Sequence, residues 1–177
     1  MFKKLILRKL ILVITILVCF FCETSFSQIF SMYHTFPNLL LMITAFVGFL
    51  CGRREGIYAG LLSGFLLDCF SGSTIGFNTL LFMYIGFVNG LFKRMYYDED
   101  ALTPIALVSI SDLAYHFIYF VFNFMVRNKM ELGYYFPHII LPEILFTIIV
   151  TLVAYPVFMK VNKKLLQVEK GSETLLD

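Results

Sequence analysis

Tryptophan is absent from this 177-residue sequence, and charged residues are scarce, at 15% of the chain. Soluble domains carry about 25% charged residues. Hydrophobic residues make up 59% of the sequence, and the mean hydropathy is +0.83. A soluble fold of this length would expose far too much apolar surface. The composition therefore excludes a soluble domain and predicts one integral membrane domain over residues 1–177, in which tyrosine supplies any interfacial aromatic belt.

Motifs of common catalytic and metal centres are also missing. The three histidines are scattered, and the patterns HExxH, GxGD, GxxxxGK[ST] and paired CxxC do not occur. Metal sites need His, Cys or carboxylates at ligand spacing, and nucleophilic catalysis needs a Ser or Cys beside a base. We therefore expect a protein that is not an enzyme, with no metal and no cofactor.

Six apolar runs predict an all-α, polytopic membrane helix bundle. They lie at about 5–29, 36–52, 56–71, 76–92, 101–126 and 137–159, with a basic C-terminal tail at 160–177. The runs 56–71 and 76–92 are shorter than the roughly 20 residues that cross a bilayer squarely. We expect these two to form a helical hairpin.

Basic residues are distributed unevenly between the two sides that these spans define. With the N-terminus in the cytoplasm, twelve of the 14 Lys and Arg residues fall on the inner side. By the positive-inside rule, both termini are cytoplasmic. Each basic run adjoins a span, so topology explains it and no nucleic-acid partner is expected.

Glycines recur every fourth position in the third span, at Gly56, Gly60 and Gly64, and Asp68 takes the next place in the series. Such positions form a slowly winding ridge on which another helix can approach closely. An unpaired charge in a bilayer core costs roughly 3 kcal/mol or more, so Asp68 needs a partner. It either closes the hairpin by bonding the first-turn amides of the next span or acts directly at a partner surface.

A turn of small residues, which includes Ser71, Gly72 and Gly76, joins these two spans. Before the second span, Pro37 is placed to open the helix, and Asn38 is placed to hydrogen-bond the freed backbone groups. Glu23 lies toward the outer end of the first span, where it faces protein or the headgroup region.

Three further polar residues are expected to be buried. Asp112 and His116 are four residues apart and so share one helix face, either as a mutually satisfied pair or as part of a proton relay. Glu143 follows Pro142, which predicts a kink, and lies at a depth similar to that of Asp68. A small-molecule carrier, with these residues lining a cavity, is an alternative to a scaffold, although no internal repeat is present.

The run from Gly60 to Gly76 has the pattern G-x-x-x-G-F-x-x-D-x-x-S-G-S-T-x-G. It resembles the signature of MreD, the rod shape-determining membrane protein family. Pro37-Asn38 at the start of the second span resembles that family too, as does the late Pro156, which is followed by lysines. At Glu23 other members often carry glutamine.

The resemblance implies a non-enzymatic component of the bacterial cell-elongation machinery, multi-pass in the cytoplasmic membrane. Members of the family associate with MreC and, through it, with MreB, RodA and a class B penicillin-binding protein that builds lateral peptidoglycan. The family also resembles, in fold, the membrane substrate-binding subunits of energy-coupling-factor vitamin transporters, so a vitamin-binding subunit is the alternative function. We hypothesise that the ridge from Gly56 to Gly64 receives a transmembrane helix of MreC or, in a homodimer, of a second MreD.

Overall fold

The computed structural model describes residues 2–29, 37–71, 76–95, 102–127, 145–156 and 158–159. Within these residues every regular element is a helix and no strand occurs, which confirms the all-α class. The labelled elements are α1 (Phe2–Ile29), α2 (Leu39–Cys51), α3 (Arg53–Ser71), α4 (Phe77–Leu91), the 3-10 turn η1 (Phe92–Met95) and α5 (Leu102–Arg127). A further apolar helix covers Leu145–Pro156.

The helix bounds agree with the predicted apolar runs to within a few residues. Of the run at 137–159, residues 137–144 lie outside the described part of the chain. Among the described residues, one helical stretch, Leu102–Phe122, is both long and apolar enough to cross a membrane by itself. Leu39–Cys51, Phe77–Leu91 and Leu145–Pro156 are shorter apolar helices. The number of spans therefore stays a prediction.

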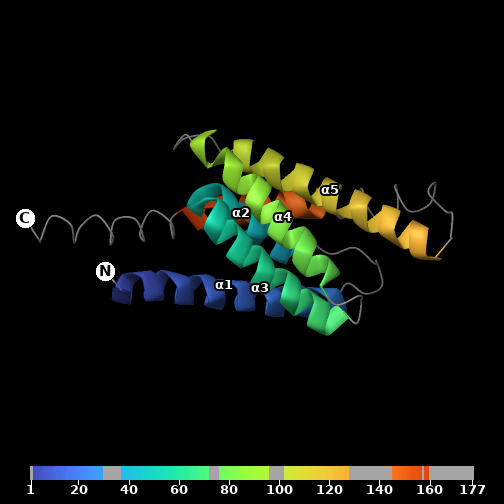
Figure 1. The fold of residues 1–177 in the computed structure, drawn as a ribbon, viewed down its shortest axis with the longest axis horizontal. Helices are drawn as coiled ribbons and strands as arrows, with labels where there is room; N and C mark the ends of the chain where they lie inside the picture. The colour runs from blue at the N-terminus through green and yellow to red at the C-terminus, as the bar shows by residue number, and fades with distance from the viewer. Residues whose placement is uncertain are drawn as a thin grey trace, which may run out of the picture.

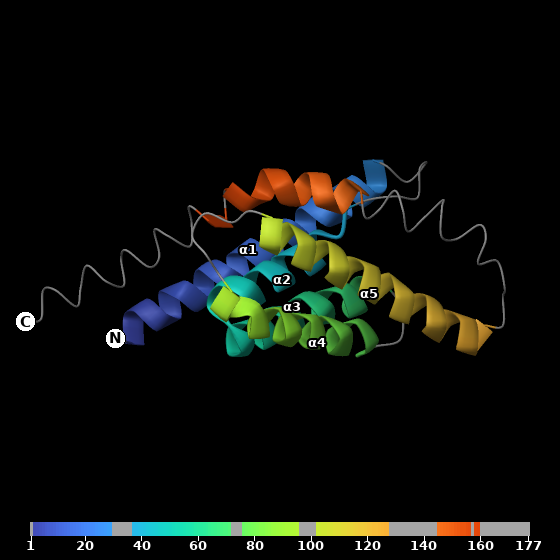
Figure 2. The same ribbon diagram turned by 90° about the horizontal axis from the view of Figure 1, so that it is seen from above.

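Helix α2 lies at the centre of the arrangement. The hairpin of α3 and α4 lies against one side of it, and the helix Leu145–Pro156 lies against the other (Figures 1 and 2). The aromatic ring of Phe46 in α2 contacts the rings of Tyr155 and Phe158. Helices α1 and α5 also contact α2. This central position explains why α2 is apolar on every face rather than along one stripe.

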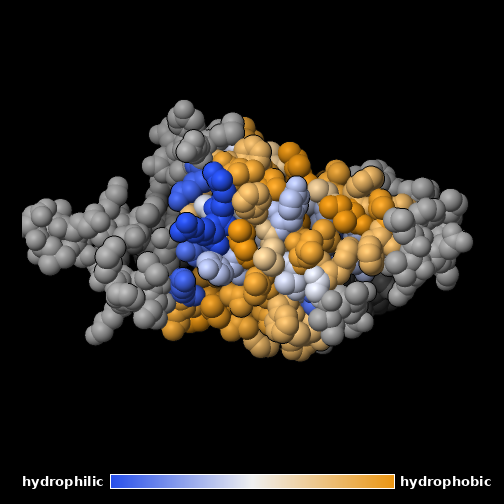
Figure 3. Space-filling view, in the orientation of Figure 1, coloured by the Kyte–Doolittle hydropathy of each residue, from blue (hydrophilic) through white to orange (hydrophobic). Residues whose placement is uncertain are grey.

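The hydrophobic core is built around α2 and receives side chains from every neighbouring helix. Its buried members include Leu40, Phe46, Phe82 and Val108. The outer faces of the helices are apolar as well, and Figure 3 shows an apolar body that ends in a hydrophilic patch. Large apolar side chains lie on this surface, and four of them, Phe21, Phe65, Tyr84 and Phe117, are each more than half exposed. An outer surface of this kind is suited to lipid.

Candidate functional site

The three glycines predicted to form a ridge on α3 are buried against the backbone of α4. A Cβ atom added at Gly60 would overlap the carbonyl group of Phe82, and one at Gly64 would overlap the backbone of Thr79. A Cβ at Gly56 would overlap the carbonyl group of Gly86. The backbones of α3 and α4 are therefore in direct contact, which only glycine permits along this face.

The close contact involves glycines on three helices. Gly48 of α2, Gly56 of α3 and Gly86 of α4 meet at one point, where each lacks room for a side chain. Farther along α4, a Cβ at Gly90 would overlap the backbone of Arg53. The sequence carries a signal for this arrangement, because Gly86 and Gly90 repeat the four-residue spacing seen on α3.

This packing corrects one expectation. The ridge from Gly56 to Gly64 was expected to receive a helix of another protein, but α4 of the same chain occupies it. The glycine spacing correctly indicates a face made for close helix packing. It does not indicate which helix covers that face, which in the structure is α4, the next helix along the chain.

Asp68 closes the same hairpin at its other end. Its Oδ2 atom accepts hydrogen bonds from the N–H of Gly76 at 2.9 Å, from the N–H of Thr79 at 3.0 Å and from the Thr79 hydroxyl at 2.6 Å. Its Oδ1 atom accepts from the N–H of Asn78 at 3.2 Å. Because the carboxylate is buried and accepts four hydrogen bonds, the geometry favours the closing role over a direct role at a partner surface.

The need for this carboxylate follows from how α4 begins. The residue before the helix is Gly76, with a φ of 96°, and it has no side chain with which to cap the first turn. Helix first-turn N–H groups lack partners within the helix and carry a partial positive charge. Asp68 supplies the missing cap from the preceding helix. Ser71 is the last residue of α3, and its side chain and all of Gly72 lie outside the described residues.

A second capped helix start lies at α2. The Asn38 side chain accepts from the N–H of Leu41 at 3.1 Å, as the sequence predicts for an N-cap residue. The Glu23 Oε2 atom of α1 accepts from the N–H of Leu40 at 2.9 Å. Pro37 was expected to open this helix, but α2 begins at Leu39 with Asn38 as its cap, so Pro37 lies before the helix. It is buried, and its carbonyl oxygen accepts from the N–H of Leu39. Sequence reasoning left the target of Glu23 open, because 17 residues separate it from Leu40.

The predicted pair in α5 lies on one helix face. Asp112 is buried, and its Oδ1 atom lies 3.7 Å from the His116 Nε2 atom. Glu143, the third predicted buried residue, lies outside the described residues. Polar contacts that the sequence did not predict join α5 to α4. Among them, the Tyr115 hydroxyl donates to Asn78 at 3.0 Å, and the Asn89 side chain amide donates to the Ser111 hydroxyl at 2.8 Å.

The polar contacts of this region join helices to one another. Asp68 accepts four hydrogen bonds within the chain, and Asn78 joins the closed hairpin to α5 through Tyr115. Among the described residues, no group of three or more His, Cys, Asp or Glu side chains is placed to hold a metal ion. The arrangement fixes the relative positions of α3, α4 and α5.

Comparison with known proteins gives one match. Residues 3–165 match the family model described as rod shape-determining protein MreD. This range contains the glycine seam, defined as Gly56, Gly60 and Gly64 of α3 in contact with the backbone of α4, and it also contains Asp68 and both capped helix starts. No curated protein and no solved structure matches the chain, so the expected fold likeness to vitamin-transporter subunits stays a prediction. Because the match covers nearly the whole sequence, the chain belongs to the MreD family of rod shape-determining membrane proteins.

Proposed function

We propose that this protein is a non-enzymatic membrane component of the rod-shape complex, which binds MreC and supports lateral peptidoglycan synthesis. Through MreC it associates with MreB, RodA and a class B penicillin-binding protein. It lies in the bacterial cytoplasmic membrane with six spans and both termini in the cytoplasm. The family match over residues 3–165 carries this proposal.

The hairpin of α3 and α4 supports a scaffolding role. Backbone contact along the glycines and the Asp68 cap hold the two helices in one register. The outward faces of the pair are apolar, with Phe65 on α3 and Tyr84 on α4 exposed. A rigid pair of helices with apolar outer faces offers partner helices a fixed surface in the membrane, since little conformational freedom is lost on binding.

Photo-crosslinking tests the association with MreC. A photoreactive amino acid is placed at exposed positions on four helices, namely Phe21, Phe65, Tyr84 and Phe117, in cells that express tagged MreC. We expect crosslinks to MreC from at least one of these helices. The matched control is Phe82, an aromatic residue on α4 that is buried in the core. Crosslinks from Phe82 alone, or from no position in a functional protein, contradict the proposal.

Depletion of the protein separates the scaffold from the alternative function. If it acts in cell elongation, rod-shaped cells become round while vitamin uptake stays normal. A vitamin-binding transporter subunit instead predicts a vitamin requirement in cells of normal shape. The second result would replace the proposed function with the alternative.

A further inference from the structure

An open pocket lies at the end of the bundle where α2 ends, α3 begins and α4 ends. It has a volume of about 690 Å³. Among the described residues that line it, Arg53, Arg54 and Lys93 are cationic and Glu55 is acidic. The pocket therefore has an excess of positive charge and is suited to an anion.

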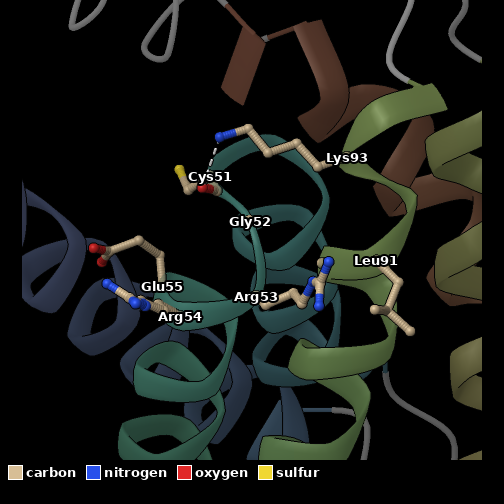
Figure 4. A pocket seen from close by; sticks show the side chains of 8 residues that line it. Cys51, Gly52, Arg53, Arg54, Glu55, Leu91 and Lys93 are labelled. Carbon is tan, nitrogen blue, oxygen red and sulfur yellow. Dashed lines mark hydrogen bonds between the residues drawn. The ribbon is translucent and has the colours of Figure 1, made fainter.

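The three cations extend in different directions: Lys93 toward Cys51, Arg53 toward Leu91, and Arg54 to the side where Glu55 lies (Figure 4). Figure 4 shows Lys93 crossing above Gly52, while Arg53 and Arg54 leave the first turn of α3 in different directions. The Lys93 Nζ atom donates to the carbonyl oxygen of Cys51 at 2.9 Å. This bond holds the ammonium group at the pocket. An ammonium group has three donors, so two remain for a ligand.

Gly52 keeps the centre of the pocket open. Its φ is 102°, and a Cβ atom there would come within 3.2 Å of the Lys93 side chain. A residue with a side chain would be strained at this φ and would push against the lysine. The glycine therefore preserves both the turn between α2 and α3 and the space beneath Lys93.

The position of the pocket points to a ligand that is both charged and apolar. In Figure 3 the hydrophilic patch borders directly on the apolar body. Leu91, which is 43% exposed, lines the pocket beside the cations. Topology alone requires only that basic residues lie on the inner side, not that they line one pocket together with an exposed leucine. A lipid headgroup whose acyl chains continue along the exposed face of α4 satisfies both features.

We propose that this pocket binds the phosphate group of an anionic phospholipid of the inner leaflet. Basic pockets between transmembrane helices on the cytoplasmic side are known to hold such headgroups. Arg53 offers a planar, bidentate donor pair to phosphate oxygens, and Arg54 and Lys93 add charge. This inference concerns lipid recognition and goes beyond the proposed association with MreC.

Fluorescence anisotropy of labelled lipids tests the proposal. The full chain in neutral maltoside micelles is titrated with labelled phosphatidylglycerol and, as the zwitterionic comparison, labelled phosphatidylcholine. We expect tighter binding of phosphatidylglycerol. Each basic residue near the surface contributes about 1 kcal/mol, or about fivefold in affinity, so Arg53→Gln combined with Arg54→Gln weakens that binding about 25-fold.

Two single variants complete the design. Glu55→Gln removes the carboxylate from the lining and strengthens binding of phosphatidylglycerol, and it tests the site even if the double arginine variant fails to fold. Lys9→Gln is the matched control, because Lys9 is an exposed cation of α1 that lies over the Tyr58 ring and is not among the residues that line the pocket. It leaves binding unchanged.

Four results would overturn the proposal. They are equal affinity for the two lipids, an unchanged affinity in a folded double arginine variant, full displacement of the lipid by millimolar inorganic phosphate, and tighter binding of an acidic peptide such as polyglutamate. The third would assign the pocket to a free phosphate compound, and the fourth to an acidic protein partner.

Discussion

In the pair α1–α2 and in the pair α3–α4, the first helix helps to cap the start of the second, but the side chains that accept the hydrogen bonds differ. In each pair, a buried carboxylate near the end of the first helix accepts hydrogen bonds from the first-turn N–H groups of the second. Asp68 accepts three bonds from backbone N–H groups and one from the Thr79 hydroxyl, all from residues eight to eleven positions away. At α2 two side chains share the capping: Asn38 accepts from the N–H of Leu41, and Glu23 accepts from the N–H of Leu40.

The difference follows from how closely the helices approach. Glycines on α3 bring its backbone against that of α4, so a short Asp side chain reaches the next helix start. Helix α1 contains no glycine and packs through large side chains such as Ile16 and Phe20. The longer Glu23 side chain spans the distance between α1 and the start of α2 and accepts from the N–H of Leu40. Asn38 accepts from the N–H of Leu41, which Glu23 does not bond. Where the backbones of α3 and α4 touch, one residue, Asp68, caps the helix start. Where α1 and α2 pack through side chains, two residues, Asn38 and Glu23, share the capping.

The largest expected loss of stability comes from a side chain introduced into the glycine seam between α3 and α4. Gly60→Leu places a side chain where the carbonyl group of Phe82 lies, so α3 and α4 must separate. We expect a loss of about 4 kcal/mol or more of unfolding free energy. The midpoint of SDS-induced unfolding, followed by far-UV circular dichroism, measures it.

The control for this variant is Tyr84→Leu, which places leucine at a position on α4 that is 62% exposed. Its unfolding midpoint should stay close to that of the parent chain. Equal midpoints for the two variants would show that the seam is not under packing constraint.

Removal of the Asp68 carboxylate is expected to have the next largest effect. Asp68→Leu leaves the N–H groups of Gly76, Asn78 and Thr79 without their acceptor, at a cost of about 3 kcal/mol. Asp68→Asn costs only about 1 kcal/mol, because its amide oxygen still accepts from Gly76 and Thr79 when it takes the Oδ2 position.

The same SDS titration separates the two variants, and complementation of rod shape in depleted cells gives a functional measure. If Asn and Leu destabilise equally, the charge rather than the set of acceptors closes the hairpin. Full stability of both would mean that the cap contributes nothing.

Glu23 is expected to matter less than Asp68, because α2 has a local cap. Glu23→Leu removes the acceptor of the Leu40 N–H and costs about 1.5 kcal/mol. Glu23→Gln keeps an acceptor oxygen and is nearly neutral. If Glu23→Leu lost more unfolding free energy than Asp68→Leu, the cap from α1 would contribute more to stability than the cap from α3, contrary to this expectation.

The smallest effect is expected at Asn38. Asn38→Ala removes the bond to the Leu41 N–H, and N-cap replacements of this kind cost about 1 kcal/mol. Combining it with Glu23→Leu tests whether the two caps share one function. We expect the double variant to lose more than the sum of the single losses, because each cap alone still holds the first turn. Simple additivity would indicate two independent contacts.

Sequence reasoning found the features that depend on neighbours along the chain. The spacing of Gly56, Gly60 and Gly64 indicated a face for close packing, and Asp68 was placed near the amides of the next helix. Asn38, next to Pro37, was expected to hydrogen-bond the freed backbone groups at the start of the second span. These predictions succeeded because helical periodicity and capping act over a few residues.

What the sequence did not identify depends on contacts between distant residues. It did not connect Glu23 with Leu40 or Tyr115 with Asn78, which are 17 and 37 residues apart. It also assigned the glycine ridge to an outside helix, although Gly86 on α4 carried the matching spacing.

The sequence by itself determined that this is an apolar, helical chain of the MreD family with a glycine-spaced packing face, and it left two roles open for Asp68. The tertiary structure decided which helix covers the glycines and which helix start Glu23 caps. The reason is physical. Periodicity shows that a helix face lacks side chains, but many apolar helices compete equally for such a face, and only packing of the whole bundle selects one.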